Sequence, residues 1–300
     1  MSDLKLNLGC GGSLVTSDDW INLDYAPANA SVQQADLLAR LPLAAGSVAV
    51  VYSSHFIEHV PRSHVPGILG ECFRVLRPGG VMRLVLPDIE EMCREYLARR
   101  EASEHEKADF VVVEMIDQCV RLTGGGELGQ LYRRYAADPA RHSEMIDYLR
   151  ARNGEDLRPR LSPLRLEIGQ PEEERQGRSD GSLLTRLAHR SNRLRTFPGR
   201  LRTRARHAWF EWLLQQLPPT FRLQNVSVAS VGERHHWLWD LHQITQALQR
   251  AGFEQVERSQ FNTSRVADFP FYPLDVDDEG RARKGAESMY VEASKPARCS

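Results

Sequence analysis

Apolar runs separated by turn residues recur through the first ninety residues, at the rhythm of alternating strands and helices. Residues 4–8, 20–23, 31–37, 48–52 and 81–86 are predicted as five strands. The run at 48–52 is apolar throughout, as expected of a central parallel strand that is buried on both faces. Helical spacing over 59–76 predicts a helix that ends at the Arg-Pro-Gly-Gly turn of residues 77–80. This alternation predicts an α/β fold with a doubly wound, mostly parallel sheet.

The strand and helix rhythm is lost after Asp88 and returns at Trp239. Helical patterns at 89–100, 110–121, 128–135, 142–152 and 209–217 predict a mainly helical insertion after strand five. A helix at 239–251 and strands at 253–259 and 288–293 then complete a seven-stranded sheet. We therefore predict three parts, which are the first part of the sheet domain (1–88), the insertion (89–231) and the completion of the sheet (232–300).

Composition narrows the classes of function. A net charge of −1 argues against a nucleic-acid binder that works through overall charge. The five cysteines are scattered without a C-x-x-C pair, which indicates reduced thiols rather than a disulfide framework. No apolar run approaches the roughly 20 residues of a membrane span, and a strand-like segment follows Met1 closely. We expect a protein without a signal peptide that resides in the cytoplasm; its oligomeric state is left open.

The segment 175–206 carries ten arginines and a single acid, Asp180, within a polar region at 157–208 that has no clear pattern. The arginines suit three interpretations. They could bind an anionic substrate, contact a membrane surface together with the leucines among them, or simply form a solvated helix face.

A glycine-rich turn, Gly9-Cys10-Gly11-Gly12, directly follows the first predicted strand. Glycine lets the backbone approach a ligand at the carboxyl edge of the sheet, where open α/β folds bind ligands. Asp24 ends the second strand 15 residues after Gly9, where a carboxylate can accept hydrogen bonds from both hydroxyls of a ribose. The turn lacks the last glycine of G-x-G-x-x-G, and the separation is shorter than in dinucleotide enzymes, which disfavours a nicotinamide cofactor. A tight turn without a ligand is the alternative.

The ordered motifs of residues 4–88 resemble those of class I (Rossmann-like) S-adenosylmethionine-dependent methyltransferases. They are Leu6–Gly12, Ile21–Asp24, Ala35–Leu37, Tyr52–His59 and Leu76–Gly80. The resemblance implies S-adenosylmethionine as cofactor, with Gly9 and Gly11 at its methionine end, Asp24 on the ribose, Asp36 at the adenine amino group and Leu37 against the ring. Ser53 and Ser54 are expected to lie under the cofactor, and we assign Leu8 and Cys10 to the same site.

Three residues are candidates for the chemistry, namely His55, Glu58 and His59. A methyl acceptor that is a hydroxyl must lose its proton to a base or to a metal-assisted acceptor. His55 is the candidate for that base or for a group that orients the substrate, and the alternatives are structural roles for these residues or catalysis by proximity alone. Glu-His at this place resembles methyltransferases in which an E-x-x-E-H pattern holds a divalent metal. Here His55 replaces the first glutamate, and many relatives carry Glu-His without metal, where the glutamate favours a helix N-terminus. We predict no metal.

His235, His236 and Trp237 begin a C-terminal segment that resembles a bacterial subgroup associated with polysaccharide or other glycoconjugate assembly. We expect these residues to bind the substrate, although an aromatic cluster that starts a helix explains them equally well. The leading hypothesis is O-methylation of a sugar or glycoconjugate by in-line transfer, with a small-molecule or glycan acceptor and no nucleic acid. The alternatives are methylation of another small molecule, a non-catalytic adaptor and a nicotinamide oxidoreductase.

Overall fold

The structure, a computed structural model, describes residues 3–27, 29–158, 209–210, 212–229 and 232–297. The chain divides into two compact units. The larger one holds residues up to 121, 126–161 and 230 onward, and the smaller one holds 122–125 and 162–229. The arginine-rich segment 175–206 lies outside the described residues. Membrane contact or anion binding through these arginines therefore stays a prediction.

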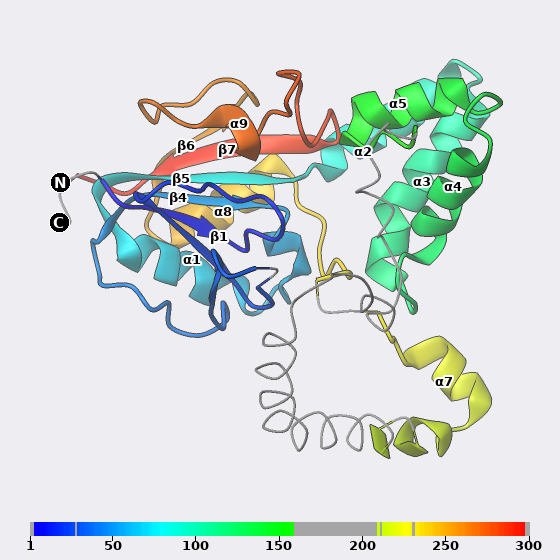
Figure 1. The fold of residues 1–300 in the computed structure, drawn as a ribbon, viewed down its shortest axis with the longest axis horizontal. Coiled ribbons are helices and arrows are strands. Elements are labelled where there is room, and N and C mark those ends of the chain that lie inside the picture. Colours follow the sequence, from blue (N-terminus) through cyan, green and yellow to red (C-terminus); the bar gives the residue numbers. More distant parts are fainter. Residues whose placement is uncertain (1–2, 28, 159–208, 211, 230–231, 298–300) are drawn as a thin grey trace, which may run out of the picture. The chain divides into compact units, whose positions relative to one another are not determined.

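A seven-stranded sheet forms the centre of the larger unit, in the order β3-β2-β1-β4-β5-β7-β6 (Figure 1). Neighbouring strands are parallel except β7, which is antiparallel to both β5 and β6. The strands are β1 (Lys5–Leu8), β2 (Trp20–Asp24), β3 (Gln33–Gln34), β4 (Val48–Ser54), β5 (Leu76–Pro87), β6 (Glu254–Ser259) and β7 (Ser288–Ser294). The predicted fold class is confirmed.

Each face of the sheet has its own apolar core. Helices α1 (Val65–Val75) and α8 (Leu241–Arg250) cover one face, where residues such as Val51, Leu69 and Ile244 are buried. The segment between β6 and β7, which contains the short helix α9 (Phe271–Leu274), covers the other face around Tyr52 and Tyr290 (Figure 1). Because α1 and α8 fill the first face, the carboxyl edge of the parallel strands is the place left for ligands.

Four helices follow β5, and the last three of them build an apolar cluster of their own. They are α2 (Ile89–Glu101), α3 (His105–Val120), α4 (Gly126–Ala137) and α5 (Ser143–Asn153), and residues such as Phe110, Ile146 and Leu149 are buried among them. The smaller unit contains α7 (Pro219–Asn225). The bounds of the predicted insertion, 89–231, stay a prediction. Among the described residues, none of the helices combines the length and apolar composition that a bilayer crossing requires.

In the part of the chain up to residue 88, three predicted elements differ from the structure by more than two residues. The third strand is only two residues long, because Gln33 and Gln34 are both exposed and the apolar Leu37 is buried beyond it. The predicted helix at 59–76 begins only at Val65, after a single 3-10 turn, η1 (Ile57–His59). Strand β5 begins at Leu76 instead of Val81, since a bulge lets Leu76 pair with Val48.

Candidate active site

The glycine-rich turn after β1 is a tight bend held by the neighbouring strand. Gly9 and Gly11 have positive φ angles of 65° and 51°, which favour glycine. The N–H groups of Gly9 and Cys10 both donate to the carbonyl oxygen of Leu23. A Cβ on Gly9 would lie 2.7 Å from Cγ of Phe56, whereas a Cβ on Gly11 or Gly12 would meet nothing within 4 Å. The Phe56 side chain therefore packs against Gly9, whereas the turn has free space for a ligand beside Gly11.

Two buried asparagines, which sequence reasoning did not single out, hold the loop that follows this turn. The Asn7 side chain donates to Ser13 O at 2.7 Å and to Asn22 Oδ1 at 2.9 Å. The Asn22 side chain in turn donates to Val15 O at 2.9 Å. Such pairing satisfies polar groups that burial would otherwise penalise. The consequence is that residues 10–19 run as a fixed loop, without the helix that usually follows the first strand of such folds.

Asp24 points toward the glycine-rich turn from the end of β2. Its Oδ2 accepts the N–H of Gly11 at 2.8 Å and its Oδ1 accepts the N–H of Ala26 at 2.9 Å. Each carboxylate oxygen has a second lone pair, so both can also accept a ligand hydroxyl. Asp36 is exposed, and its Oδ1 accepts the N–H of Leu38. The N–H of Ala35 donates to the Asp24 carbonyl, which places the two carboxylates on neighbouring strand ends.

The remaining residues assigned to the cofactor lie around the same strand ends. Leu8 and Leu37 are buried in the core. The Ser53 hydroxyl donates to Leu8 O at 2.9 Å across β1 and β4, and Ser54 ends β4. Burial, followed by the charge of Asp24, raises the pKa of the Cys10 thiol to about 11, so it stays protonated at neutral pH. These positions are consistent with a cofactor site, whose ligand contacts stay a prediction.

His55 follows β4 in a left-handed backbone conformation, with φ of 49°. Such a conformation is strained for a residue with a side chain, and it occurs often at functional sites. Its Nε2 lies 2.9 Å from Oγ of Ser288, the first residue of β7. Its Nδ1 lies 3.3 Å from Oε1 of Glu58. Burial, and after it the charge of Lys284, lowers the pKa of His55 well below its usual range, which leaves a neutral imidazole.

Glu58 lies in η1 and is completely buried. Neither carboxylate oxygen makes a hydrogen bond with another described residue, and burial raises the pKa of the side chain to about 8. The contact with His55 is therefore not an ion pair at neutral pH, because both groups favour their neutral forms. Glu58 lies in the first turn of η1, and the longer helix α1 begins only seven residues later.

His59 and His235 lie beside Glu58, although they come from opposite ends of the chain. The N–H at Nδ1 of His59 donates to the carbonyl oxygen of Arg234 at 2.9 Å. The rings of His59 and His235 are 4.7 Å apart in an edge-to-face arrangement. Burial lowers the pKa of both, to about 3 for His235. One donor atom each from Glu58, His59 and His235 lies within 4.8 Å of the others, so these three residues can hold a metal ion.

Of the three residues predicted to bind substrate, only His235 contributes a side-chain donor atom to this group. His236 is exposed, and its N–H donates to the carbonyl oxygen of Glu58 at 2.6 Å. The Trp237 indole donates to Oε1 of Gln243 at 2.7 Å, and the Arg62 guanidinium lies 4.3 Å from its ring centre. The alternative of an aromatic cluster that starts a helix accounts for these contacts. Substrate binding by His236 and Trp237 stays a prediction.

A second polar cluster lies next to this group. Arg152 is buried and donates to Glu114 at 2.6 Å and to Glu91 at 3.0 Å. Burial raises the pKa of Glu287 well above its usual range and lowers that of Lys284. Sequence reasoning missed these residues, because they come from four separate segments that carry no common motif.

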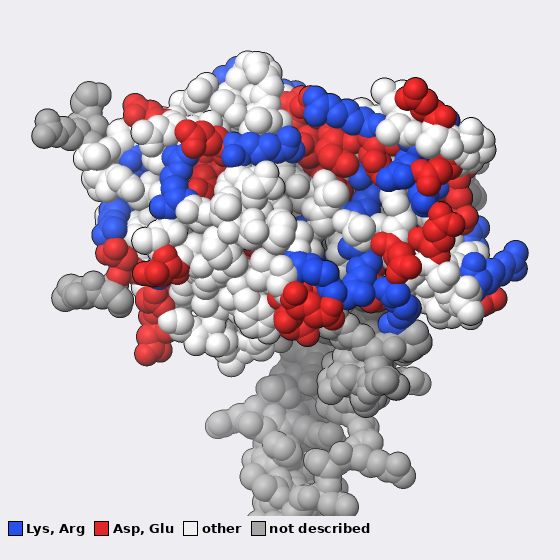
Figure 2. Space-filling view, turned by 90° about the horizontal axis from the view of Figure 1, so that it is seen from above, with Lys and Arg blue, Asp and Glu red and all other residues white. Residues whose placement is uncertain are grey.

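A pocket of about 760 Å³ opens between α5, the start of α2 and the segments that flank β6 and β7. Ser288, the partner of His55, lies in its wall with Phe261, Tyr290 and Arg150. The pocket thus combines aromatic rings with polar and charged groups. On the face of the molecule seen in Figure 2, basic and acidic side chains are interspersed over much of the surface.

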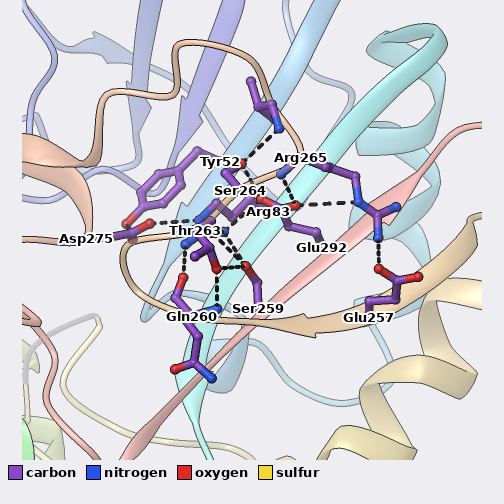
Figure 3. Close-up of polar contacts among 11 residues, drawn as sticks. Tyr52, Arg83, Glu257, Ser259, Gln260, Thr263, Ser264, Arg265, Asp275 and Glu292 are labelled. Carbon is purple, nitrogen blue, oxygen red and sulfur yellow. Dashed lines mark hydrogen bonds and ion pairs between the residues drawn. The ribbon is translucent and has the colours of Figure 1, made fainter.

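Arg83 of β5 fixes the chain that forms one side of this pocket (Figure 3). Its guanidinium donates to Asp275 and Glu292, each at 2.7 Å. It also donates to the carbonyl oxygens of Gln260 and Thr263 at 2.8 and 3.0 Å. Because Gln260 lines the pocket, these bonds set the position of the pocket wall. An arginine inside an apolar strand is the signal from which the sequence could have indicated this network.

Comparison with known proteins agrees with this geometry. Residues 6–84 match a family model described as a methyltransferase domain. No curated protein matches the chain. A solved S-adenosylmethionine-dependent methyltransferase of Archaeoglobus fulgidus is similar at 10% identity and a TM-score of 0.36, over 98% of this chain and 86% of that one. One from Mesorhizobium loti is similar at 20% identity and a TM-score of 0.22, over 30% of this chain and 47% of that one.

The chain thus spans about half the length of the Mesorhizobium loti protein. TM-scores below 0.5 do not establish a common fold, so the family match and the strand order carry the assignment. The matched segment contains the glycine-rich turn, Asp24, Asp36 and the start of η1. The match of residues 6–84 to a methyltransferase domain, together with the strand order of the sheet, supports S-adenosylmethionine as the cofactor.

Proposed function

We propose that the chain transfers a methyl group from S-adenosylmethionine to an oxygen of a small-molecule acceptor, with a sugar or glycoconjugate hydroxyl as the acceptor class. The observation that supports it best is the contact between His55 and Ser288. This contact joins the end of β4, next to the glycine-rich turn, to the wall of the 760 Å³ pocket. An acceptor in that pocket would lie at the carboxyl edge of the sheet, where class I domains bind both reactants.

The cofactor supplies the methyl group and the leaving group, so the protein has to orient the acceptor and manage one proton. His55 is suited to the proton, because a neutral imidazole has a free lone pair. If Nε2 faces the acceptor hydroxyl in place of Ser288, Nδ1 keeps its proton on the side of Glu58, 3.3 Å away. Glu58, which is neutral at rest, can accept a hydrogen bond from this N–H through its carbonyl oxygen and so orient the imidazolium that forms during transfer.

The sugar class is supported by two features. Phe261 and Tyr290 in the pocket wall offer rings against which a sugar can stack, and Arg150 and Ser288 offer hydrogen bonds. The second is the resemblance of the C-terminal segment to a subgroup associated with glycoconjugate assembly. Another small molecule with a hydroxyl would make the same contacts, so the acceptor panel in the test includes both classes.

The first test is calorimetric titration with S-adenosylhomocysteine and, separately, with NAD. We expect heat with the former alone; heat with NAD alone would overturn the proposal. The second test measures S-adenosylhomocysteine release with a panel of sugars, nucleotide sugars and phenolic hydroxyl compounds. We expect turnover with a member of the sugar classes. Cofactor binding without turnover on any acceptor would favour the non-catalytic adaptor.

The role of His55 is tested with His55→Ala against His64→Ala, an exposed histidine at the start of α1. We expect His55→Ala to lower turnover at least about 100-fold, as for loss of a general base, and to leave the affinity for S-adenosylhomocysteine within about threefold. His64→Ala should change neither. Equal turnover in both variants would remove His55 from the mechanism.

A further inference from the structure

We propose that Glu58, His59 and His235 form a binding site for a divalent transition-metal ion. Their donor atoms lie within 4.8 Å of one another, although His235 comes from the other end of the chain. Two of the residues belong to η1, and the third belongs to the segment that leads into α8. The site is inferred from these donors alone, and only the catalytic role of the ion rests on the proposed function.

Two of the three donor residues, Glu58 and His235, are buried and carry polar atoms without a hydrogen-bond partner among the described residues. The Glu58 side chain is completely buried, and neither of its oxygens bonds to another described residue. Nδ1 of His235 is also buried without a hydrogen-bond partner among the described residues. Burying unpaired polar groups costs free energy, and a carboxylate costs the most. A bound cation would use these atoms and offset that cost.

His59 is already arranged as a metal ligand. Its Nδ1 carries the proton that is donated to Arg234 O at 2.9 Å, so its lone pair is on Nε2. Ligating histidines in proteins usually bind the metal through one nitrogen and donate from the other to a carbonyl or carboxylate. That hydrogen bond fixes both the tautomer and the direction of the ring.

The protein backbone holds the three residues together independently of any ion. The N–H of His236 donates to the carbonyl oxygen of Glu58 at 2.6 Å. The N–H of His235 donates to the carbonyl oxygen of Gln118 in α3 at 2.9 Å. These bonds tie the segment of His235 to η1 and to α3, so the site is preformed. Donors of a tetrahedral ion lie about 3.4 Å apart at ligand distances of about 2.1 Å, which small side-chain rotations can reach.

The donor set favours a particular class of ion. Two imidazoles and one carboxylate suit Zn²⁺, Fe²⁺, Co²⁺ or Mn²⁺, whereas Mg²⁺ and Ca²⁺ prefer sites made of oxygen atoms. Three protein ligands leave at least one position open, as in catalytic zinc sites. The charge of Lys284 acts on all three donors and opposes the ion, so we expect moderate affinity.

If the proposed function holds, the open position would take the acceptor hydroxyl or a water. A metal ion there lowers the pKa of the bound oxygen, so that the proton can leave at neutral pH. His55 is 3.3 Å from Glu58 and can take that proton. The metal and the imidazole would then act on the same oxygen.

The test is titration of the full chain, stripped with EDTA, with Co²⁺ followed by visible absorption and with Zn²⁺ and Mg²⁺ followed by calorimetry. We expect one Co²⁺ or Zn²⁺ per chain and at least tenfold weaker binding of Mg²⁺. Removal of one ligand in His235→Ala or Glu58→Gln should weaken Zn²⁺ binding at least about 100-fold. His236→Ala, an exposed neighbour outside the donor set, serves as the matched control and should bind as the wild type does.

Equal Zn²⁺ affinity in His235→Ala and His236→Ala would overturn the proposal, and so would less than half an equivalent bound by the wild type. Circular dichroism spectra show whether each variant folds. If Glu58→Gln does not fold, the comparison of His235→Ala with His236→Ala still decides the test. Binding of S-adenosylhomocysteine is measured on the same samples. Metal binding without cofactor binding would support the metal site and overturn the proposed function. Cofactor binding without metal binding would overturn the metal site and leave the proposed function standing.

Discussion

Replacing Arg83 with methionine tests whether the buried charge network determines the stability of this fold. The side chain is completely buried in β5, between Asp275 on one side and Glu292 on the other. Methionine fills a similar volume without charge. The change leaves two buried carboxylates without the cation, and it removes the donors to the carbonyl oxygens of Gln260 and Thr263 (Figure 3).

The expected loss of unfolding free energy depends on which hydrogen bonds the two carboxylates keep in Arg83→Met. Breaking one buried ion pair costs about 3–5 kcal/mol. Asp275 keeps the hydroxyl of Tyr52 at 2.8 Å, and Glu292 keeps the N–H of Arg265 at 2.9 Å. These contacts compensate in part, so we expect a loss near the lower end, about 3 kcal/mol. That is a large fraction of the roughly 5–15 kcal/mol that stabilise a typical domain.

The assay is urea unfolding followed by circular dichroism, with Arg94→Met as the control. Arg94 pairs with Glu90 in α2, but their side chains are 72% and 48% exposed, so its loss should cost less than about 0.5 kcal/mol. The double variant Arg83→Met with Asp275→Asn should lose less than the sum of the single losses, because one stranded charge is gone. A loss below about 1 kcal/mol in Arg83→Met, or additive losses, would refute the reasoning.

Two predictions concern the cofactor site. Asp24→Ala removes the acceptor for the ribose hydroxyls, and at about 1.5–3 kcal/mol for a charged hydrogen bond we expect roughly 10–100-fold weaker binding of S-adenosylhomocysteine by calorimetry. Unchanged affinity would place the ribose elsewhere. Gly9→Ala should lower the unfolding free energy by at least about 1–2 kcal/mol, because its φ is positive and the new Cβ would collide with Phe56. Gly12→Ala, whose Cβ meets open space, should cost under about 1 kcal/mol, and equal losses would contradict this account.

The sheet could be predicted from the sequence wherever a strand is buried on both faces. Val48–Ser54 is apolar for most of its length, because neighbouring parallel strands and the two covering layers leave it no contact with water. The failures occur where a strand is short or irregular. Gln33 and Gln34 are exposed at the edge of the sheet and give no apolar signal. Leu76–Gly80 contains Pro78 and Gly79, which indicate a turn, yet a bulge keeps the segment paired.

The candidate site also contains residues that the sequence could indicate and residues that it could not, depending on whether they are close together in the chain. The residues predicted to bind the cofactor follow the ends of consecutive strands, where a local motif with fixed spacing indicates them. Ser288 and His235 come into the site from distant segments, and no spacing relates either of them to His55 or Glu58. Only the return of the chain along β7 and into α8 brings them near.

The three ligands of the proposed metal site likewise share no fixed spacing in the sequence. A local E-x-x-E-H pattern presents its ligands within one turn, and here His55 stands at its first position and contacts Ser288 instead of joining the donor set. The third donor of the proposed site is His235, which the carbonyl oxygens of Gln118 and Glu58 position through two consecutive N–H groups. A search by spacing therefore finds two of three ligands at most. If the titrations show one ion per chain, the local motif lacks one ligand, and the fold supplies it as His235. Backbone hydrogen bonds to distant segments hold that residue in place.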